Sequence, residues 1–417
     1  MGGTLVFAAT FLWQLSNFGF NAIGAHTLGP AQYGILASAA GMLYLLSPLV
    51  TAVQTAASRE ATRITVSEDG SEIRGLVRYY MARIGVGACV IAVLVGLLSP
   101  VISSILHLGS PMLVVVFAIA IPITISSVLV RGVHQGTRRF GRYSLGTAAE
   151  GTAKLAFAVL WLGFLWRTPM AGMTAVAVSA FVGLAVNVLL LRHWPRPTRH
   201  VRPASHPLRY STTTFAVFSL LAILLSVDTM AARRFLPPYV AGLYSGISLT
   251  GKIVFFATTA LTAFLFPLFS ARHDAGEDTL RWLKVSVLPV LAVSGALIVV
   301  YLAVPALVVD TLLGAKFRQH EGYLPWMAAV FTLYALAYLL VTYLLARRQS
   351  GVSVVLVAAV VCQLGGLGLF HRTIGDFLRD LAVAFAVALV GCLWLVAHSH
   401  ERSAQELTPA PMSIELL

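Results

Sequence analysis

The chain has 417 residues, of which 58% are hydrophobic and only 11% are charged, and its formal net charge is +13. This composition excludes an ordinary soluble domain. Apolar runs of roughly 20 residues recur along the chain, which is the length that crosses about 30 Å of hydrocarbon. The sequence therefore predicts an integral membrane protein.

The apolar runs predict an all-α, polytopic fold with about twelve transmembrane helices. These spans cover residues 4–26, 33–57, 84–106, 111–130, 143–166, 170–191, 211–235, 240–266, 283–305, 323–346, 352–371 and 376–397. The first run has no basic residue before it and no convincing cleavage site. We therefore expect it to be a retained helix rather than a signal peptide.

The basic residues predict the orientation of the chain. Of its 29 lysines and arginines, 20 lie in one set of alternate loops, seven in the opposite set and two within spans. Because cytoplasmic loops carry an excess of these residues, both termini are expected in the cytoplasm. The protein is expected in the inner (plasma) membrane. The same alternation, without a soluble domain long enough for such a site, argues against a nucleic-acid partner.

A short segment occurs twice, at 28–36 and at 236–244. Leucine, proline and glycine recur 208 positions apart, and each copy predicts a turn between two apolar helices. The repeat divides the chain into two six-helix lobes. We expect these parts to be an N-terminal lobe at 1–191, a basic, proline-rich cytoplasmic linker at 192–209, a C-terminal lobe at 210–398 and a disordered cytoplasmic tail at 399–417. Because six spans is an even number, the lobes should be related by a pseudo-twofold axis along the membrane normal.

Polar residues form a stripe along the first span. Thr10, Gln14, Asn17 and Asn21 are spaced so that they share one helical face. Side-chain amides facing lipid would be costly, so the stripe should face other helices or water. Interhelical hydrogen bonds are one interpretation. A water-filled cavity is the one that we favour, because the stripe is longer than one packing contact needs.

Charged residues lie deep within three other spans. Glu150 and Lys154 are four apart in the fifth span, with Lys154 roughly 16 Å from its start. Lys252 lies at a similar depth in the eighth span, so both lysines need partners or water and are candidates for function. The alternative for Lys154 is a structural pair with Glu150.

The seventh span carries Asp228, with Arg233 near its outer end. Asp228 is interpreted either as a proton or cation site or as the partner of an arginine. Arg131, at the inner end of the fourth span, is expected to be a topological anchor.

No catalytic constellation is present. The sequence contains no zinc-ligand spacing, no HExxH motif, no Walker A loop and no motif that specifies a catalytic triad. We therefore expect no catalytic residue, no metal and no cofactor, and a protein that is not an enzyme.

Several short motifs together resemble the polysaccharide (oligosaccharide) flippases. The motifs are Leu28-Gly29-Pro30-x-x-Tyr33-Gly34, Ser58-Arg59-Glu60, Asp228, Leu236-Pro237-Pro238-x-x-Ala241-Gly242-Leu243-Tyr244, Phe266-Pro267 and Leu313-Gly314. This family belongs to the multidrug/oligosaccharidyl-lipid/polysaccharide (MOP) exporter superfamily, with the multidrug and toxin extruders (MATE) and the lipid II flippases. The resemblance covers nearly the whole chain. It implies a MATE-like fold with a central cavity, spans 1 and 7 at the lobe interface, and outward passage of lipid-linked oligosaccharides.

The resulting hypothesis is a flippase for an oligosaccharide on polyprenyl phosphate or pyrophosphate, acting by alternating access in cell-surface polysaccharide biosynthesis. Gln14, Asn17 and Asn21 would bind the sugar, and Lys154 and Lys252, with Arg233, the phosphate. Glu150 or Asp228 would couple transport to a proton or sodium gradient. Membrane lipids and the glycosyltransferases or polymerase of the same pathway are the expected partners of a monomer.

Three alternatives stay open. A cation-coupled multidrug exporter of the MATE type should have a more acidic and aromatic site. A lipid II flippase usually has two extra helices. A glycan polymerase or ligase usually needs a large external loop, and the loops here are short.

Overall fold

The computed structural model describes residues 2–67, 73–192, 212–274, 280–347, 349 and 351–406. Most of the expected linker and residues 407–417 of the expected tail lie outside this range. The helices are α1 (Gly2–Leu28), α2 (Pro30–Ser67), α3 (Ile73–Leu97), α4 (Ser99–Ile105), α5 (Pro111–Gly136), α6 (Phe140–Ala158), the π-helix η1 (Val159–Leu165), α7 (Pro169–Leu191), α8 (Thr212–Phe235), α9 (Pro238–Asp274), α10 (Leu280–Ala303), α11 (Pro305–Leu312), the 3₁₀ helix η2 (Ala315–Tyr323), α12 (Leu324–Ala346), α13 (Val352–Leu369) and α14 (Ile374–Glu406).

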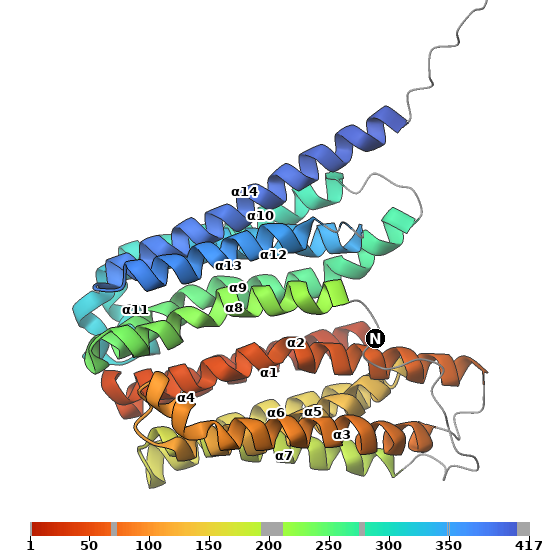
Figure 1. Cartoon of the computed structure of the whole chain (residues 1–417), viewed down its shortest axis with the longest axis horizontal. Helices are drawn as coiled ribbons and strands as arrows, with labels where there is room; N and C mark the ends of the chain where they lie inside the picture. The colour runs from red at the N-terminus through yellow and green to blue at the C-terminus, as the bar shows by residue number, and fades with distance from the viewer. Residues whose placement is uncertain are drawn as a thin grey trace, which may run out of the picture.

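The helices form two lobes with the same packing scheme. In the N-terminal lobe α1 packs on α6, α2 on α5, and α5 on α3 and α7. In the C-terminal lobe α8 packs on α13, α9 on α12, and α12 on α10 and α14, so each contact has its counterpart seven labels later. Figure 1 shows the two lobes one above the other. The N-terminal lobe faces its neighbour with α1 and α2, and the C-terminal lobe with α8 and α9. The predicted all-α, two-lobed membrane fold is confirmed.

Eleven helices among the described residues are long and apolar enough to cross a membrane. α1 is not among them although it has 27 residues, because Gln14, Asn17 and Asn21 make it more polar. It packs on α6 as α8 packs on α13, and so holds the place of a twelfth span.

Two helices have ends that differ from the predicted boundaries. The third span begins at Ile73 and ends at Leu97, and the rest of the predicted run is the separate helix α4, whose first turn contains Pro100. α14 continues to Glu406, eight residues into the segment expected to be disordered. Hydropathy alone misplaced these ends because a polar extension outside the bilayer can stay helical.

Two helices begin with a hydroxyl cap followed by proline at one end of the molecule. Pro111 opens α5 behind Ser110, whose hydroxyl accepts from the Met112 amide, and Pro169 opens α7 behind the cap Thr168. Gly29, with φ of 71°, makes the sharp turn between α1 and α2. We call this end, which carries residues 28–30 and 235–238, the outer end, since the basic residues predict that it faces outward; it lies at the left in Figure 1.

The two repeated turns pack against each other at the outer end. A Cβ built on Gly34 would lie 3.0 Å from the Gly242 Cα, and one built on Gly242 would overlap the Pro30 carbonyl oxygen. The Tyr33 ring meets the Phe317 ring edge-on with centroids 5.9 Å apart. The two halves of the chain are therefore in direct backbone contact where the sequence repeats.

Side chains also cross between the two hydrophobic cores. Tyr33 of α2 belongs to the core of the C-terminal lobe, and Met230 of α8 belongs to the core of the N-terminal lobe. Side chains of the two lobes thus interlock across the interface at these positions.

Candidate functional site

Lys154 of α6 is a buried ammonium group at the border of the N-terminal lobe. Its Nζ donates to Oδ1 of Asn17 on α1 at 2.7 Å and lies 5.3 Å from the centre of the Trp13 ring. The residue is only 7% exposed, and among the described residues no carboxylate forms an ion pair with it. Burying such a charge without a counter-ion is costly, so this position is suited to an anion.

Glu150 does not pair with Lys154, although the two are four residues apart. Its Oε2 lies 3.2 Å from Nη2 of Arg131 on α5, and both side chains are buried. Arg131, which the sequence suggested as a topological anchor, is buried within the lobe, because α5 continues to Gly136. Arg131 therefore forms the ion pair with Glu150, and Lys154 forms none with any carboxylate in the described part of the chain.

The amide stripe of α1 faces protein on both sides of the lobe interface. Asn17 contacts Lys154, while Gln14 Nε2 donates to Thr259 Oγ1 of α9 at 3.4 Å. Asn21 Oδ1 accepts from the Tyr33 hydroxyl at 3.4 Å. The stripe thus lies between α6 of one lobe and α9 of the other.

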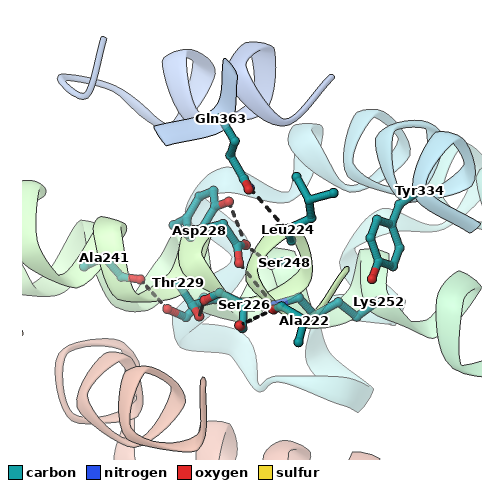
Figure 2. A network of polar contacts seen from close by, with 12 residues as sticks. Ala222, Leu224, Ser226, Asp228, Thr229, Ala241, Ser248, Lys252, Tyr334 and Gln363 are labelled. Carbon is teal, nitrogen blue, oxygen red and sulfur yellow. Dashed lines mark hydrogen bonds and ion pairs between the residues drawn. The ribbon is translucent and has the colours of Figure 1, made fainter. Parts of the chain in front are cut away.

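Asp228 of α8 is fully buried in the C-terminal lobe and has three partners on α9. Its Oδ2 accepts from Tyr244 at 2.9 Å and from Ser248 at 2.7 Å. Its Oδ1 lies 3.4 Å from the Lys252 ammonium, so the partner is a lysine and not the arginine considered from the sequence. Figure 2 shows this network, with Gln363 of α13 beside it donating to the Leu224 carbonyl of α8 at 3.1 Å.

Lys252 also lines a small cavity between the lobes. The cavity has a volume of about 20 Å³, which is room for about one water molecule. Its polar lining consists of Asn21, Tyr33 and Tyr44 from the N-terminal lobe and Thr229, Ser245 and Lys252 from the C-terminal lobe. At this point little space remains between the lobes, because α2 packs closely on α8 and α9.

A larger hollow of about 570 Å³ lies between α3 and α5. Its lining is nearly all apolar, including Val86, Val90 and Leu94 of α3, whose side chains are exposed. It has none of the amides and charges that recognise a sugar or phosphate, so we do not place the site there.

Arg233 lies apart from the two lysines, on the last turn of α8. Its Nε and Nη2 donate to the His107 carbonyl oxygen at 3.0 and 2.8 Å. The candidate residues thus fall into three groups: Lys154 with the amides of α1, Lys252 with Asp228, and Arg233 at the outer end. Across the described residues, no group of three or more His, Cys, Asp or Glu side chains is arranged to hold a metal ion.

Sequence reasoning missed the hydroxyl partners of Asp228, although a signal for them existed. Tyr244, Ser248 and Lys252 are spaced by four and share one face of an apolar helix. It also missed Asp380 of α14, a buried carboxylate whose Oδ2 has no hydrogen-bond partner in the part of the chain that the structure describes. No sequence signal joined Arg131 to Glu150, because the two residues come from different helices.

Comparisons with known proteins agree with this architecture. The family model described as "Polysaccharide biosynthesis protein" matches residues 2–273. An inward-facing MATE-family multidrug resistance transporter of the MOP superfamily has a TM-score of 0.72 at 15% identity, covering 95% of this chain and 96% of that one. The same family in an outward-facing conformation has a TM-score of 0.64 at 13% identity, covering 98% and 97%. The eukaryotic MATE transporter AtDTX14 has a TM-score of 0.65 at 13% identity, covering 95% and 94%.

A search among curated proteins gives no sequence match. The structural neighbours, all well below 25% identity, establish the fold, and the family model covers well over half of the chain. The chain therefore belongs to the polysaccharide biosynthesis protein family and has the MATE fold.

Proposed function

We propose that this protein is a flippase that moves an oligosaccharide linked to polyprenyl phosphate or pyrophosphate from the inner to the outer leaflet by alternating access. The observation that carries the proposal is the Lys154 ammonium, which is buried beside the lobe interface and has an amide but no described carboxylate for a partner. A phosphate would supply the missing negative charge. A membrane protein that had only to be stable would gain nothing from such a group.

The surroundings of Lys154 suit the rest of such a substrate. Gln14, Asn17 and Asn21 offer both donors and acceptors along one face of α1, as sugar hydroxyls require. Lys252 faces the same interface from the opposite lobe, through the small cavity that it shares with Asn21. Separation of the lobes would widen this cavity and bring both lysines to one passage.

Ion coupling is part of the proposal, with Glu150 or Asp228 as the responding carboxylate. Each is already neutralised by a basic side chain, Arg131 for Glu150 and Lys252 for Asp228. A proton or a sodium ion would have to compete with that side chain. Substrate phosphate that draws Lys252 away from Asp228 would make such competition easier.

The setting of the protein follows the same proposal. The inner membrane holds it as a monomer with both termini in the cytoplasm, so that the outer end opens to the outside. Membrane lipids surround it, and glycosyltransferases or a polymerase of the same pathway supply and consume its substrate.

Transport by reconstituted protein tests this function. Proteoliposomes with a labelled lipid-linked oligosaccharide would be assayed for wild type, Lys154→Gln, Lys154→Arg and, as a matched control, Lys284→Gln, which removes an exposed lysine. We expect Lys154→Gln to lower the rate about ten- to hundredfold, as the loss of one charge-assisted contact of roughly 1.5–3 kcal/mol implies. Lys154→Arg should retain part of the rate and Lys284→Gln all of it. Equal rates for wild type and Lys154→Gln would contradict the assigned role.

The second candidate is a multidrug exporter of the MATE type. It is favoured by the MATE neighbours and by two buried carboxylates, Asp228 and Asp380, in the C-terminal lobe. The same proteoliposomes separate the two functions. Efflux of an organic cation without movement of lipid-linked oligosaccharide would replace the flippase by the exporter.

A further inference from the structure

Arg233 joins the two lobes at the outer end through a contact that must break when that end opens. Two nitrogens of its guanidinium, Nε and Nη2, donate to the carbonyl oxygen of His107, which lies in the turn between α4 and α5 of the other lobe. The residue is 7% exposed, and its third nitrogen, Nη1, is buried and has no hydrogen-bond partner among the described residues. Within the described part of the chain, no carboxylate forms an ion pair with it.

The turn that receives Arg233 is held in a strained shape. His107 has φ of 48°, in the left-handed region that costs a residue with a side chain roughly 1 kcal/mol or more. The next residue, Leu108, is buried in the core of the N-terminal lobe, so the turn moves with that lobe. The neighbouring Arg234 donates from Nη1 to Nε2 of the His107 ring at 3.0 Å, because an arginine can only donate.

Opening the outer end separates these partners. The His107 carbonyl would leave with the N-terminal lobe, while Arg233 would stay on α8 at the wall of the passage. Its planar fork of donors would then lack an acceptor, and such a fork matches phosphate oxygens with two parallel hydrogen bonds.

We propose that Arg233 is an outer phosphate site, which binds the His107 carbonyl when the outer end is closed and the phosphate or pyrophosphate group of the substrate when it is open. This inference rests on the proposed function, which supplies the anion. Lys154 lies eleven residues before the end of η1 at Leu165, roughly 16 Å from the outer end along the helix. The substrate would therefore pass from a deep ammonium to an outer guanidinium as the lobes rearrange.

The exchange also gives the anion an influence on conformation. A ligand shifts an equilibrium between two states only by its difference in affinity for them. Nε and Nη2 are engaged by His107 in the closed state, so an anion can use them only in the open state. Phosphate binding at Arg233 therefore favours the open outer end.

Spin-label distances across the outer end test the proposal. Full-length protein in lipid nanodiscs would carry labels at Ser104→Cys on α4 and Phe370→Cys after α13, two exposed positions on opposite lobes. The three native cysteines would be replaced by alanine. Distances are measured with millimolar sodium pyrophosphate and with sodium chloride at equal ionic strength. We expect pyrophosphate, but not chloride, to add a longer-distance population to the wild type.

Three variants decide whether Arg233 is responsible. Arg233→Gln should raise the ratio of long to short distances about tenfold without any ligand, because the two hydrogen bonds to the His107 carbonyl are lost. The distances in this variant should not change when pyrophosphate is added. Arg233→Lys keeps the charge but not the fork, and should respond more weakly than wild type. Arg234→Gln, the neighbouring control, should still respond.

The outcomes are separable from those of the transport assay. An unchanged wild-type distance with pyrophosphate, or a response of Arg233→Gln equal to that of wild type, overturns the outer phosphate site. A wild type that opens with pyrophosphate yet moves no lipid-linked oligosaccharide supports this site and refutes only the proposed function.

Discussion

The contact between the repeated turns predicts that one methyl group will open the outer end. A Cβ on Gly242 would overlap the Pro30 carbonyl oxygen and lie 2.8 Å from the Pro30 Cα. These are backbone atoms at the start of α2, so they cannot rotate away as a flexible side chain could. Gly242→Ala must therefore move α9 away from α2.

The magnitude follows from the cost of overpacking. Inserting a methyl group into a well-packed contact costs typically about 1–3 kcal/mol, which corresponds to a change of about 5- to 150-fold between closed and open states. Gly34→Ala should have a smaller effect, because its Cβ would meet Gly242 at 3.0 Å and a shift of a few tenths of an ångström relieves the contact. Gly87→Ala on α3 should have none, since nothing lies within 4 Å of its Cβ.

The same pair of spin labels across the outer end measures the effect. The long-distance population should be largest in Gly242→Ala and smaller in Gly34→Ala. In Gly87→Ala it should equal that of the wild type. A Gly242→Ala protein with wild-type distances and wild-type melting temperature would refute the reasoning, because it would show that the turns do not restrain the lobes.

The buried ion pairs give the remaining predictions. Asp228→Asn should lower the free energy of unfolding by about 3–5 kcal/mol, because it leaves the Lys252 ammonium uncompensated, and the double variant with Lys252→Gln should recover part of the loss. Glu150→Gln should destabilise by a similar amount, because it leaves the buried Arg131 guanidinium uncompensated. Melting in detergent measures each variant. Asp310→Asn, which breaks an exposed pair with Arg318, serves as the control and should melt as wild type does. A control as unstable as Asp228→Asn would show that burial is not the cause.

Much of the architecture could be predicted from the sequence because a bilayer leaves few choices. Every backbone polar group must be satisfied within a span, so apolar runs of the right length become helices. The repeat at 28–36 and 236–244 similarly indicated two equivalent halves. Helix ends were less predictable, as α3 and α14 show, because polar extensions such as residues 399–406 stay helical outside the hydrocarbon.

The chemistry of the polar residues could be predicted only in part. That Lys154 and Lys252 need partners follows from their depth alone. Which partner each has does not, because direction around a helix and the approach of a neighbouring helix decide it. Glu150 pairs with Arg131 of another helix, although Lys154 is closer to it in the sequence. Asp228 pairs with Lys252, which follows it by 24 residues.

The sequence by itself thus determined the membrane class, the two lobes and the set of costly buried charges. Only the tertiary structure decided that Lys154 lacks a counter-ion among the described residues and that Arg233 holds His107 of the other lobe. The physical reason is that the two properties depend on different parts of the chain. Hydropathy acts on each helix separately, whereas the balance of a buried charge depends on every side chain within a few ångströms, and those side chains come from helices far apart in the chain.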